Sequence, residues 1–315
     1  MTRLPSTSAL MVILCTTGAW GQSALPDGFD IDGHVNLAYS GFAGDDWQLY
    51  ATTDLDVSWT NGTYGIDVSL IGFAAEGTSL SAFFGAVSYT FADQHKISFG
   101  APRAAYDEFA GFRYSDYFES LGTIASFGGA SSFLTIYNLV LEGDTYTILG
   151  LRYDGQVQGA EIAGSVHASP DGSGFLISSS ARFQLNSGAV AGGFEYLDVD
   201  DIEVSNLMLR YDTRFGKFDL GAGFARTNIQ PTVGPGSVTV STYELAADYS
   251  FTDAISAGAL WVQIAQDFGG PSMEQTFYGL RGKYGFAGGA SANATAMKMQ
   301  GDDDVQYSVS LRYDF

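Results

Sequence analysis

The closing segment Gln306-Tyr307-Ser308-Val309-Ser310-Leu311-Arg312-Tyr313-Asp314-Phe315 alternates polar and apolar side chains with a period of two. Successive side chains of a β-strand point to opposite faces, so one face of this segment is apolar and aromatic and the other is polar. A soluble sandwich would turn the apolar face toward a protein core, whereas a membrane barrel turns it toward lipid and lines water with the polar face. Alternation alone predicts a strand and leaves both kinds of protein open.

The same alternation recurs along nearly the whole chain, and no sustained helical period replaces it. It marks sixteen segments, most of them about 9 to 13 residues long, which is the length of a tilted strand that crosses a bilayer. Strands of soluble proteins are usually nearer about 5 to 6 residues. We predict strands at residues 33–42, 46–60, 63–75, 79–91, 94–102, 144–153, 160–168, 174–185, 189–199, 202–214, 217–228, 238–250, 255–267, 273–285, 288–299 and 304–315.

The connections between these segments alternate in character. One set is short and turn-like, at residues 61–62, 92–94, 186–188, 215–216, 252–253 and 287–288. The other set is more acidic or richer in glycine and proline, at residues 43–46, 169–174, 198–201, 228–237, 267–272 and 301–304. This asymmetry is typical of the periplasmic turns and outer loops of an outer-membrane barrel.

Aromatic side chains gather at the short-turn ends of the segments. They are Trp59, Tyr89, Phe91, Tyr153, Tyr211, Phe215, Tyr249, Phe251, Tyr284, Phe286, Tyr313 and Phe315. Amphipathic rings favour a membrane interface, and a ring of them around one end of a barrel makes a girdle. We therefore predict an all-β fold, a transmembrane antiparallel β-barrel of sixteen strands.

The amino terminus reads as a secretory signal. Arg3 precedes an apolar run at residues 9–14, and small residues follow up to Gly21. We expect residues 1–21 to be a signal peptide and residues 22–315 to form the outer-membrane barrel. Cys15 would leave with the signal, so the barrel would contain no disulfide. The formal net charge of −21 makes nucleic acid a poor partner.

One connection breaks the short-loop pattern. About forty residues, at about 102–143, separate the fifth segment from the sixth, and a loop of that length is usually functional. It is rich in aromatic residues, which favours folding inward against the barrel wall over exposure to water. A surface flap or partner-binding loop is the alternative. Its acidic residues are Asp107, Glu108, Asp116 and Glu119.

The chain resembles the trimeric general-diffusion porins of alphaproteobacteria, of the Rhodobacter type. The similar stretches are residues 97–100 (Ile-Ser-Phe-Gly), 125–133 (Ala-Ser-Phe-Gly-Gly-Ala-Ser-Ser-Phe), 149–153 (Leu-Gly-Leu-Arg-Tyr) and 311–315 (Leu-Arg-Tyr-Asp-Phe). The resemblance implies a homotrimer, a third loop folded into the lumen as a constriction, and passive passage of small hydrophilic solutes. The terminal Phe315 implies delivery to the barrel-insertion machinery, in the outer membrane of a Gram-negative bacterium with its lipid and lipopolysaccharide. The family also implies a transverse field, with acids on the loop facing bases on the wall.

Strand parity places a set of basic residues on the lumen side. They are Arg152, Arg182, Arg210, Arg214, Arg281, Lys283 and Arg312. An excess of lumen and mouth carboxylates accompanies them, at Asp54, Asp56, Asp67, Glu161, Glu195, Glu244 and Asp248. We expect a weakly cation-selective diffusion channel, in which charge and size select the solute. A substrate-specific porin with a binding site in the constriction is the alternative, and a non-channel adhesin or structural barrel is a more distant one.

Neither catalysis nor a metal or cofactor centre is expected from the sequence. Ser165 and His167 share a strand face, but no nucleophile motif surrounds them, so an enzyme is not predicted. The histidines His34, His95 and His167 lack ligand spacing for a metal centre, and no cofactor is expected. The acidic runs on the outer loops leave two interpretations open: a solvated acidic surface, which we favour, and a weak Ca²⁺ site, because carboxylate oxygens suit that ion. Those residues are Asp198, Asp200, Asp201, Asp302, Asp303 and Asp304.

Overall fold

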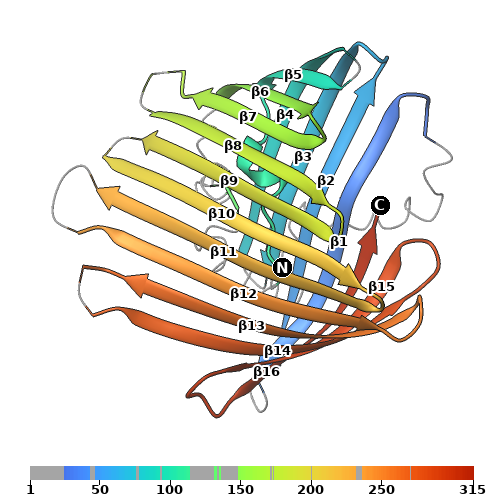
Figure 1. The fold of residues 1–315 in the computed structure, drawn as a ribbon, viewed down its shortest axis with the longest axis vertical. Helices are drawn as coiled ribbons and strands as arrows, with labels where there is room; N and C mark the ends of the chain where they lie inside the picture. The colour runs from blue at the N-terminus through green and yellow to red at the C-terminus, as the bar shows by residue number, and fades with distance from the viewer. Residues whose placement is uncertain are drawn as a thin grey trace, which may run out of the picture.

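A computed structural model describes residues 25–42, 47–75, 78–92, 94–113, 131–132, 135, 148–170, 172, 174–199, 201–231, 236–269 and 271–315. Within this part of the chain sixteen antiparallel strands form one closed barrel (Figure 1). The first half comprises β1 (Phe29–Phe42), β2 (Gln48–Thr60), β3 (Tyr64–Ala75), β4 (Thr78–Phe91), β5 (His95–Ala101), β6 (Leu149–Val157), β7 (Ala160–Ala168) and β8 (Gly174–Leu185). The second half comprises β9 (Gly188–Val199), β10 (Ile202–Phe215), β11 (Phe218–Pro231), β12 (Val238–Ser250), β13 (Ile255–Asp267), β14 (Met273–Gly285), β15 (Ala290–Met299) and β16 (Val305–Asp314). The predicted sixteen-strand barrel is confirmed.

The last strand closes the sheet on the first. β16 pairs antiparallel with β1 in a register that places Leu311 opposite Leu37 and Asp314 opposite His34. The backbone N–H of Phe315 adds a hydrogen bond to the carbonyl of Gly33 at 3.0 Å. Closure gives every strand two neighbours and leaves no open edge, which a sheet inside a bilayer requires. No helix in the described residues is long and apolar enough to cross a membrane.

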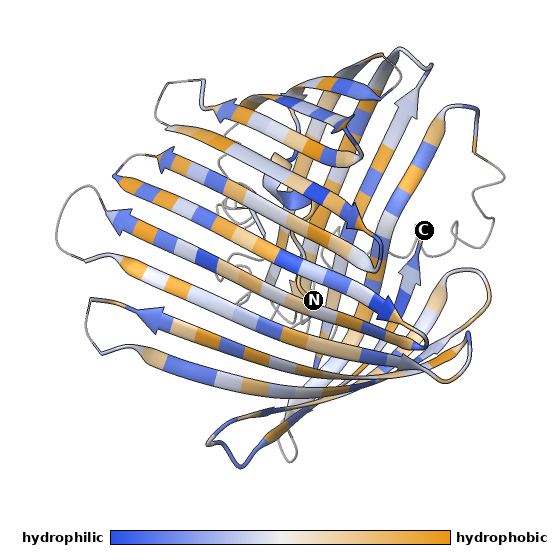
Figure 2. Ribbon diagram, in the orientation of Figure 1, coloured by the Kyte–Doolittle hydropathy of each residue, from blue (hydrophilic) through white to orange (hydrophobic). Residues whose placement is uncertain are grey.

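The outer surface of the barrel is apolar. Large side chains at alternate positions stand exposed there, with Phe83 67%, Leu280 64% and Leu311 60% accessible. Polar and apolar bands alternate along most strands in Figure 2. Apolar surface of this extent is unfavourable in water, so the barrel wall has the character of a lipid-facing surface.

Aromatic rings line the short-turn rim of the barrel. Tyr64, Tyr89 and Phe91 form one chain of ring contacts, with centroids 5.5 and 6.2 Å apart, and His95 extends it to Tyr153. Three further pairs at the same rim are Tyr249–Phe251, Tyr284–Phe286 and Tyr313–Phe315. The predicted girdle is therefore present, and the His95 ring belongs to it.

The largest error in the predicted boundaries concerns β6. The sequence predicted residues 144–153, whereas the strand begins at Leu149 and continues to Val157; residues 136–147 lie outside the described part. The strand ends at a two-residue turn of Gln158 and Gly159, both with positive φ (52° and 82°), as a type I′ hairpin requires. Asp154 and Gly155 look like turn residues in the sequence, yet both are paired in the sheet.

The lumen is less polar than strand parity predicted. One apolar cluster joins β10–β15 through Met208, Val240, Val262 and Phe277, with the other buried members Tyr106, Phe112, Ala225, Ala246, Leu260, Ile264 and Met297. A second cluster joins Phe84 on β4 to Leu176, Leu197 and Val204 on β8–β10, with Ala82 and Ala104. All of these wall residues share strand parity with lumen-facing polar groups. Parts of the inner wall are therefore packing surfaces for the chain that enters the lumen.

Gly33 on β1 allows a close approach between two strands. Its φ is +122°, and a Cβ there would lie 2.0 Å from the backbone carbonyl oxygen of Asp54. We expect Gly33→Ala to destabilise the barrel by about 2–4 kcal/mol, because backbone strain adds to a clash that no side chain can relieve. Urea unfolding followed by tryptophan fluorescence measures the change. Gly282→Ala is the matched control, because nothing lies within 4 Å of that Cβ position. Equal stability of the two variants would contradict the expectation.

Candidate functional site

The described start of the long loop lies inside the barrel. After β5 the chain enters a short 3₁₀ turn, η3 (Ala105–Glu108), drawn within the lumen in Figure 1. The N–H groups of Ala105 and Tyr106 donate to the hydroxyls of Ser165 and Ser178 at 3.0 and 3.3 Å, and Ser180 donates to the Ala105 carbonyl at 2.6 Å. These serines stand on the lumen faces of β7 and β8. They supply the polar partners that a turn lying on a sheet needs.

Arg103 holds the beginning of the loop to the wall at β2. Its Nη1 lies 2.9 Å from Asp54 Oδ1 and 3.1 Å from Asp56 Oδ2, both on β2. The Arg103 side chain is only 15% exposed, so its charge is balanced mainly by these two carboxylates. The resemblance to porins implies acids on the loop and bases on the wall. This pairing has the opposite sense, because here the loop supplies the base and the wall supplies the acids.

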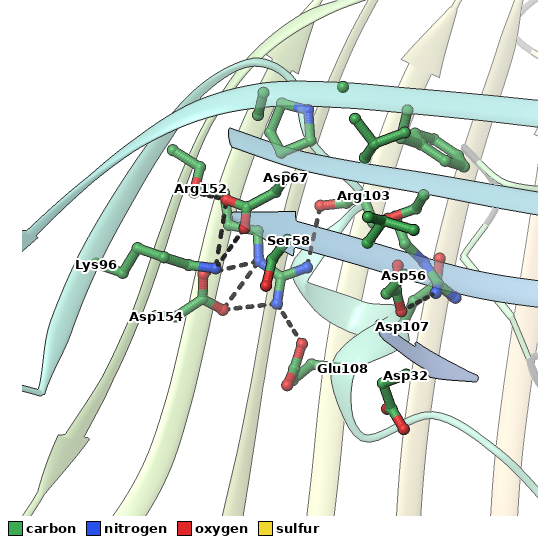
Figure 3. A pocket seen from close by; sticks show the side chains of 18 of the residues that line it. Asp32, Asp56, Ser58, Asp67, Lys96, Arg103, Asp107, Glu108, Arg152 and Asp154 are labelled. Carbon is green, nitrogen blue, oxygen red and sulfur yellow. Dashed lines mark hydrogen bonds and ion pairs between the residues drawn. The ribbon is translucent and has the colours of Figure 1, made fainter. Parts of the chain in front are cut away.

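Glu108 and Arg152 form an ion pair of the expected sense. Arg152 on β6 bonds to the Glu108 carboxylate and to Asp154 Oδ1 at 2.6 Å, and its Nη1 donates to the Arg103 carbonyl at 3.3 Å. Figure 3 shows Arg152 between Asp154 and Glu108. This arginine therefore connects the barrel wall to the 3₁₀ turn.

Arg113 fixes a second point of the loop about half-way round the barrel. Its guanidinium lies 3.0 Å from Asp212 on β10 and 3.2 Å from Asp248 on β12, while the backbone N–H of Arg113 donates to Glu244 at 3.0 Å. Two wall bases complete this network: Arg210 bonds to Asp212 and to the Gly111 carbonyl, and Arg281 bonds to Asp248 at 2.7 Å. Again a loop base lies between wall acids.

A later part of the loop meets the wall at Glu195. The Ser132 hydroxyl donates to this buried carboxylate on β9, which also accepts from Asn206 at 3.0 Å. Asp107 accepts from the Ser132 N–H and the Thr135 hydroxyl, both at 2.6 Å, so it joins two parts of the loop. Burial raises the pKa of the Asp107 carboxyl above its usual value, and the Arg103 charge opposes that rise.

A polar cavity lies beneath the loop, toward the turn end of β1–β6 (Figure 3). Its volume is about 420 Å³, and side chains of both signs line it. The acids number seven and the bases three: Asp30, Asp32, Asp56, Asp67, Asp107, Glu108 and Asp154 against Lys96, Arg103 and Arg152. Lys96 is 3.4 Å from Asp67, so all three bases are engaged with carboxylates. The cavity is a water-accessible space with an excess of negative charge.

The structure separates six of the seven predicted wall bases into two groups. Arg152, Arg210 and Arg281 belong to the networks around the loop. Arg182, Arg214 and Arg312 instead pair near the turn ends with Glu161, Asp219 and Asp314, at 3.9, 3.4 and 2.6 Å. Lys283 has lumen parity on β14, with no ion pair to a described residue. Of the predicted loop acids, Asp116 and Glu119 lie outside the described residues.

Sequence reasoning missed Arg103 and Arg113. The signal that could have identified them is their position, because each is a single base inside an apolar stretch of an inward loop, at Pro102-Arg103-Ala104 and Phe112-Arg113-Tyr114. Such a base needs an acidic partner on the wall. Asp54, Asp56 and Asp248, which the sequence placed in the lumen, supply it.

The residues considered for other chemistry have structural partners. His167 lies 3.0 Å from the Ser165 hydroxyl, but that hydroxyl also accepts from Ala105 and lies 2.8 Å from Ser178. His34 has lumen parity on β1. Among the described residues no group of three or more His, Cys, Asp or Glu is arranged to hold a metal ion. Asp200 is not described, so Ca²⁺ binding at the outer loops stays a prediction.

Comparison with known proteins shows that the fold of this chain is similar to that of several solved outer-membrane proteins. No family model matches the sequence, and no curated protein matches it. Among solved structures, the in-vitro folded outer membrane protein OmpT of Vibrio cholerae is similar at a TM-score of 0.67 and 14% identity, with 93% of this chain and 99% of that chain covered. A triple mutant of Rhodopseudomonas blastica porin gives 0.62 and 16%, with 91% and 100% covered. A further refined porin structure gives 0.62 and 18%, with the same coverage.

Proposed function

We propose that this chain forms a water-filled pore in the outer membrane of a Gram-negative bacterium and allows small hydrophilic solutes to diffuse through it. The observation that carries the proposal is a closed barrel with an apolar exterior, whose interior holds a polar cavity beneath an inward loop. The similarity to porin structures supports the same reading at the level of fold. Selection would come from the width and charge of the passage rather than from a reaction. On this proposal the protein is not an enzyme and needs no cofactor.

We also propose a weak preference for cations. The cavity has more acids than bases, and each base is engaged with carboxylates. A gradient of KCl across a planar bilayer that contains the purified protein should therefore give a reversal potential of cationic sign, strongest at low salt. Anion preference at low salt would contradict the charge assignment, and absence of any channel conductance would contradict the pore itself.

The proposal includes assembly and export. We expect a homotrimer that contacts lipid and lipopolysaccharide, a mature chain that begins near Gln22, and recognition of Phe315 by the barrel-insertion machinery. The resemblance in residues 97–100 and 311–315 motivates the trimer and the role of Phe315, and the signal-like residues 1–21 motivate the mature start. Unheated electrophoresis in detergent should show a trimer-sized band that heating converts to monomer. A monomer alone before heating would contradict the trimer.

The second candidate is a pore with a preferred solute. The observation that favours it is the mainly uncharged polar face that β15, β16 and β1 turn to the lumen, with Asn293 opposite Ser310 and Ser308 opposite Ser40, which differs from the charged cavity. A series of neutral sugars in conductance or liposome-swelling experiments separates the two candidates. A smooth dependence on size indicates general diffusion, whereas one outlying sugar indicates a binding site.

A further inference from the structure

The lumen face of β15, β16 and β1 carries mainly uncharged polar side chains. Three rows cross these strands: Ser291–Arg312–Asn36, Asn293–Ser310–Ala38 and Thr295–Ser308–Ser40. The one charged member, Arg312, is paired with Asp314 at 2.6 Å. With rows two residues apart and strands side by side, this neutral wall measures about 14 Å along the strands and about 10 Å across. It contrasts with the charged walls at β2–β6 and β10–β12.

Several polar atoms of the neutral wall are buried without a partner. The residues Asn36, Ser40, Ser291 and Thr295 are 1%, 4%, 3% and 8% exposed. Neither amide atom of Asn36, nor the hydroxyl oxygens of the other three, has a hydrogen-bond partner in the described structure. Buried polar atoms are nearly always hydrogen-bonded, so these groups are suited to bind a molecule in the lumen. Amides and hydroxyls both donate and accept, and they carry no charge.

An aromatic pair stands beside the neutral wall. Tyr50 on β2 is the strand partner of Ala38, and its ring lies 6.0 Å from that of Phe73 on β3. Both residues have the strand parity of the lumen-facing acids Asp56 and Asp67. A sugar ring presents C–H groups on its faces and hydroxyls on its edge. An aromatic pair adjacent to uncharged hydrogen-bonding groups matches that chemistry, because a ligand site combines apolar contact with a few oriented polar groups.

We propose that the neutral wall and the Tyr50–Phe73 pair form a site for neutral polyhydroxy solutes of small-saccharide size. The site rests on the proposed pore function and names a solute class for it. It lies apart from the charged networks at Arg103 and Arg113. Ions would be attracted to the acidic cavity, while a neutral sugar gains hydrogen bonds at the neutral wall.

The test uses the purified full-length barrel in planar bilayers with KCl. Sucrose should reduce the single-channel current in a saturable way, and by more than a polyethylene glycol of equal hydrodynamic radius. The variant Asn36→Ala/Ser291→Ala/Thr295→Val should raise the half-saturating sucrose concentration about tenfold or more, because it removes three hydrogen-bonding groups. Its KCl conductance should stay near that of the wild type. Its stability in urea should be unchanged or higher, because burial of an unpaired polar group is unfavourable.

The matched control is Ser58→Ala/Ser69→Ala, which removes hydroxyls from the charged cavity. It should leave the sucrose effect unchanged. Two results would overturn the inference while the pore function stands: a sucrose effect no larger than that of the polymer, or an unchanged half-saturating concentration in the triple variant. Absence of KCl conductance in the wild type would overturn the pore function and the inference together.

Discussion

Replacing Arg113 with alanine is expected to raise the mean single-channel conductance and to make the current noisier. The guanidinium donates to carboxylates on two strands and to the Asp219 carbonyl at 3.1 Å. Its removal leaves Asp212 and Asp248 without the arginine that bonds to both of them. Breaking one side of a largely buried ion network costs about 2–4 kcal/mol. That loss falls on the attachment of the loop, because the strands keep their backbone hydrogen bonds.

Two variants separate this effect from a general loss of charge. Arg214→Ala removes a base from the same side of the barrel, but that side chain is 68% exposed and pairs only loosely, at 3.4 Å, with Asp219. It should change neither conductance nor noise. Arg113→Lys keeps the charge and loses the planar fork, so an intermediate effect is expected. A quiet, wild-type current from Arg113→Ala would show that the loop does not depend on this network.

The strands were largely predictable because a barrel wall in lipid enforces a period of two. Turn chemistry marked the ends of several segments, as at Asn61-Gly62, where the Asn61 side chain accepts from two backbone N–H groups. β6 was misplaced because Asp154 and Gly155 have turn propensity but no turn in this fold. Local preference gave way there to pairing with β5 and β7.

Parity could not predict the apolar part of the lumen. In β13 the run Leu260-Trp261-Val262 is apolar on both faces, so alternation does not distinguish lipid from interior. The structure buries Leu260 and Val262 in the cluster that packs against Phe112 of the loop. Which wall the loop covers is decided by contacts between residues more than a hundred positions apart, such as Arg113 and Glu244, and no local pattern encodes them.

The sequence also could not predict which partner in each ion pair, the loop or the wall, carries the positive charge. Strand parity predicted bases on the wall, and the resemblance implied that the acids of the loop face them; Glu108 with Arg152 follows that arrangement. Arg103 and Arg113 reverse it, because each reaches carboxylates on strands that the loop crosses. The net field depends on how all of these pairs neutralise one another. The charged side chains that have no counter-charge nearby should therefore have the greatest influence on whether the pore prefers cations or anions.

Replacing Asp30 and Asp32 together with lysine is expected to change the pore from cation-preferring to anion-preferring at about 0.1 M salt. Both carboxylates are exposed to the charged cavity, and neither has a basic side chain within ion-pair distance among the described residues. The other carboxylates of the cavity include Asp56, Asp67 and Asp154, which are paired with bases. The double substitution shifts the charge of the mouth by about four units without breaking an ion pair in the described structure. The reversal potential in a KCl gradient measures the result.

Salt concentration tests whether the effect is electrostatic. The screening length is about 10 Å at 0.1 M and about 3 Å at 1 M, so the change in selectivity should be large at the lower concentration and nearly lost at the higher one. Asp303→Lys/Asp304→Lys is the matched control, because it makes the same charge change on exposed residues between β15 and β16, at the opposite end of the barrel from the cavity. A shift as large in this control would mean that overall charge sets selectivity. A shift confined to Asp30→Lys/Asp32→Lys would mean that ions pass along the β1 side of the lumen, where unpaired carboxylates face water.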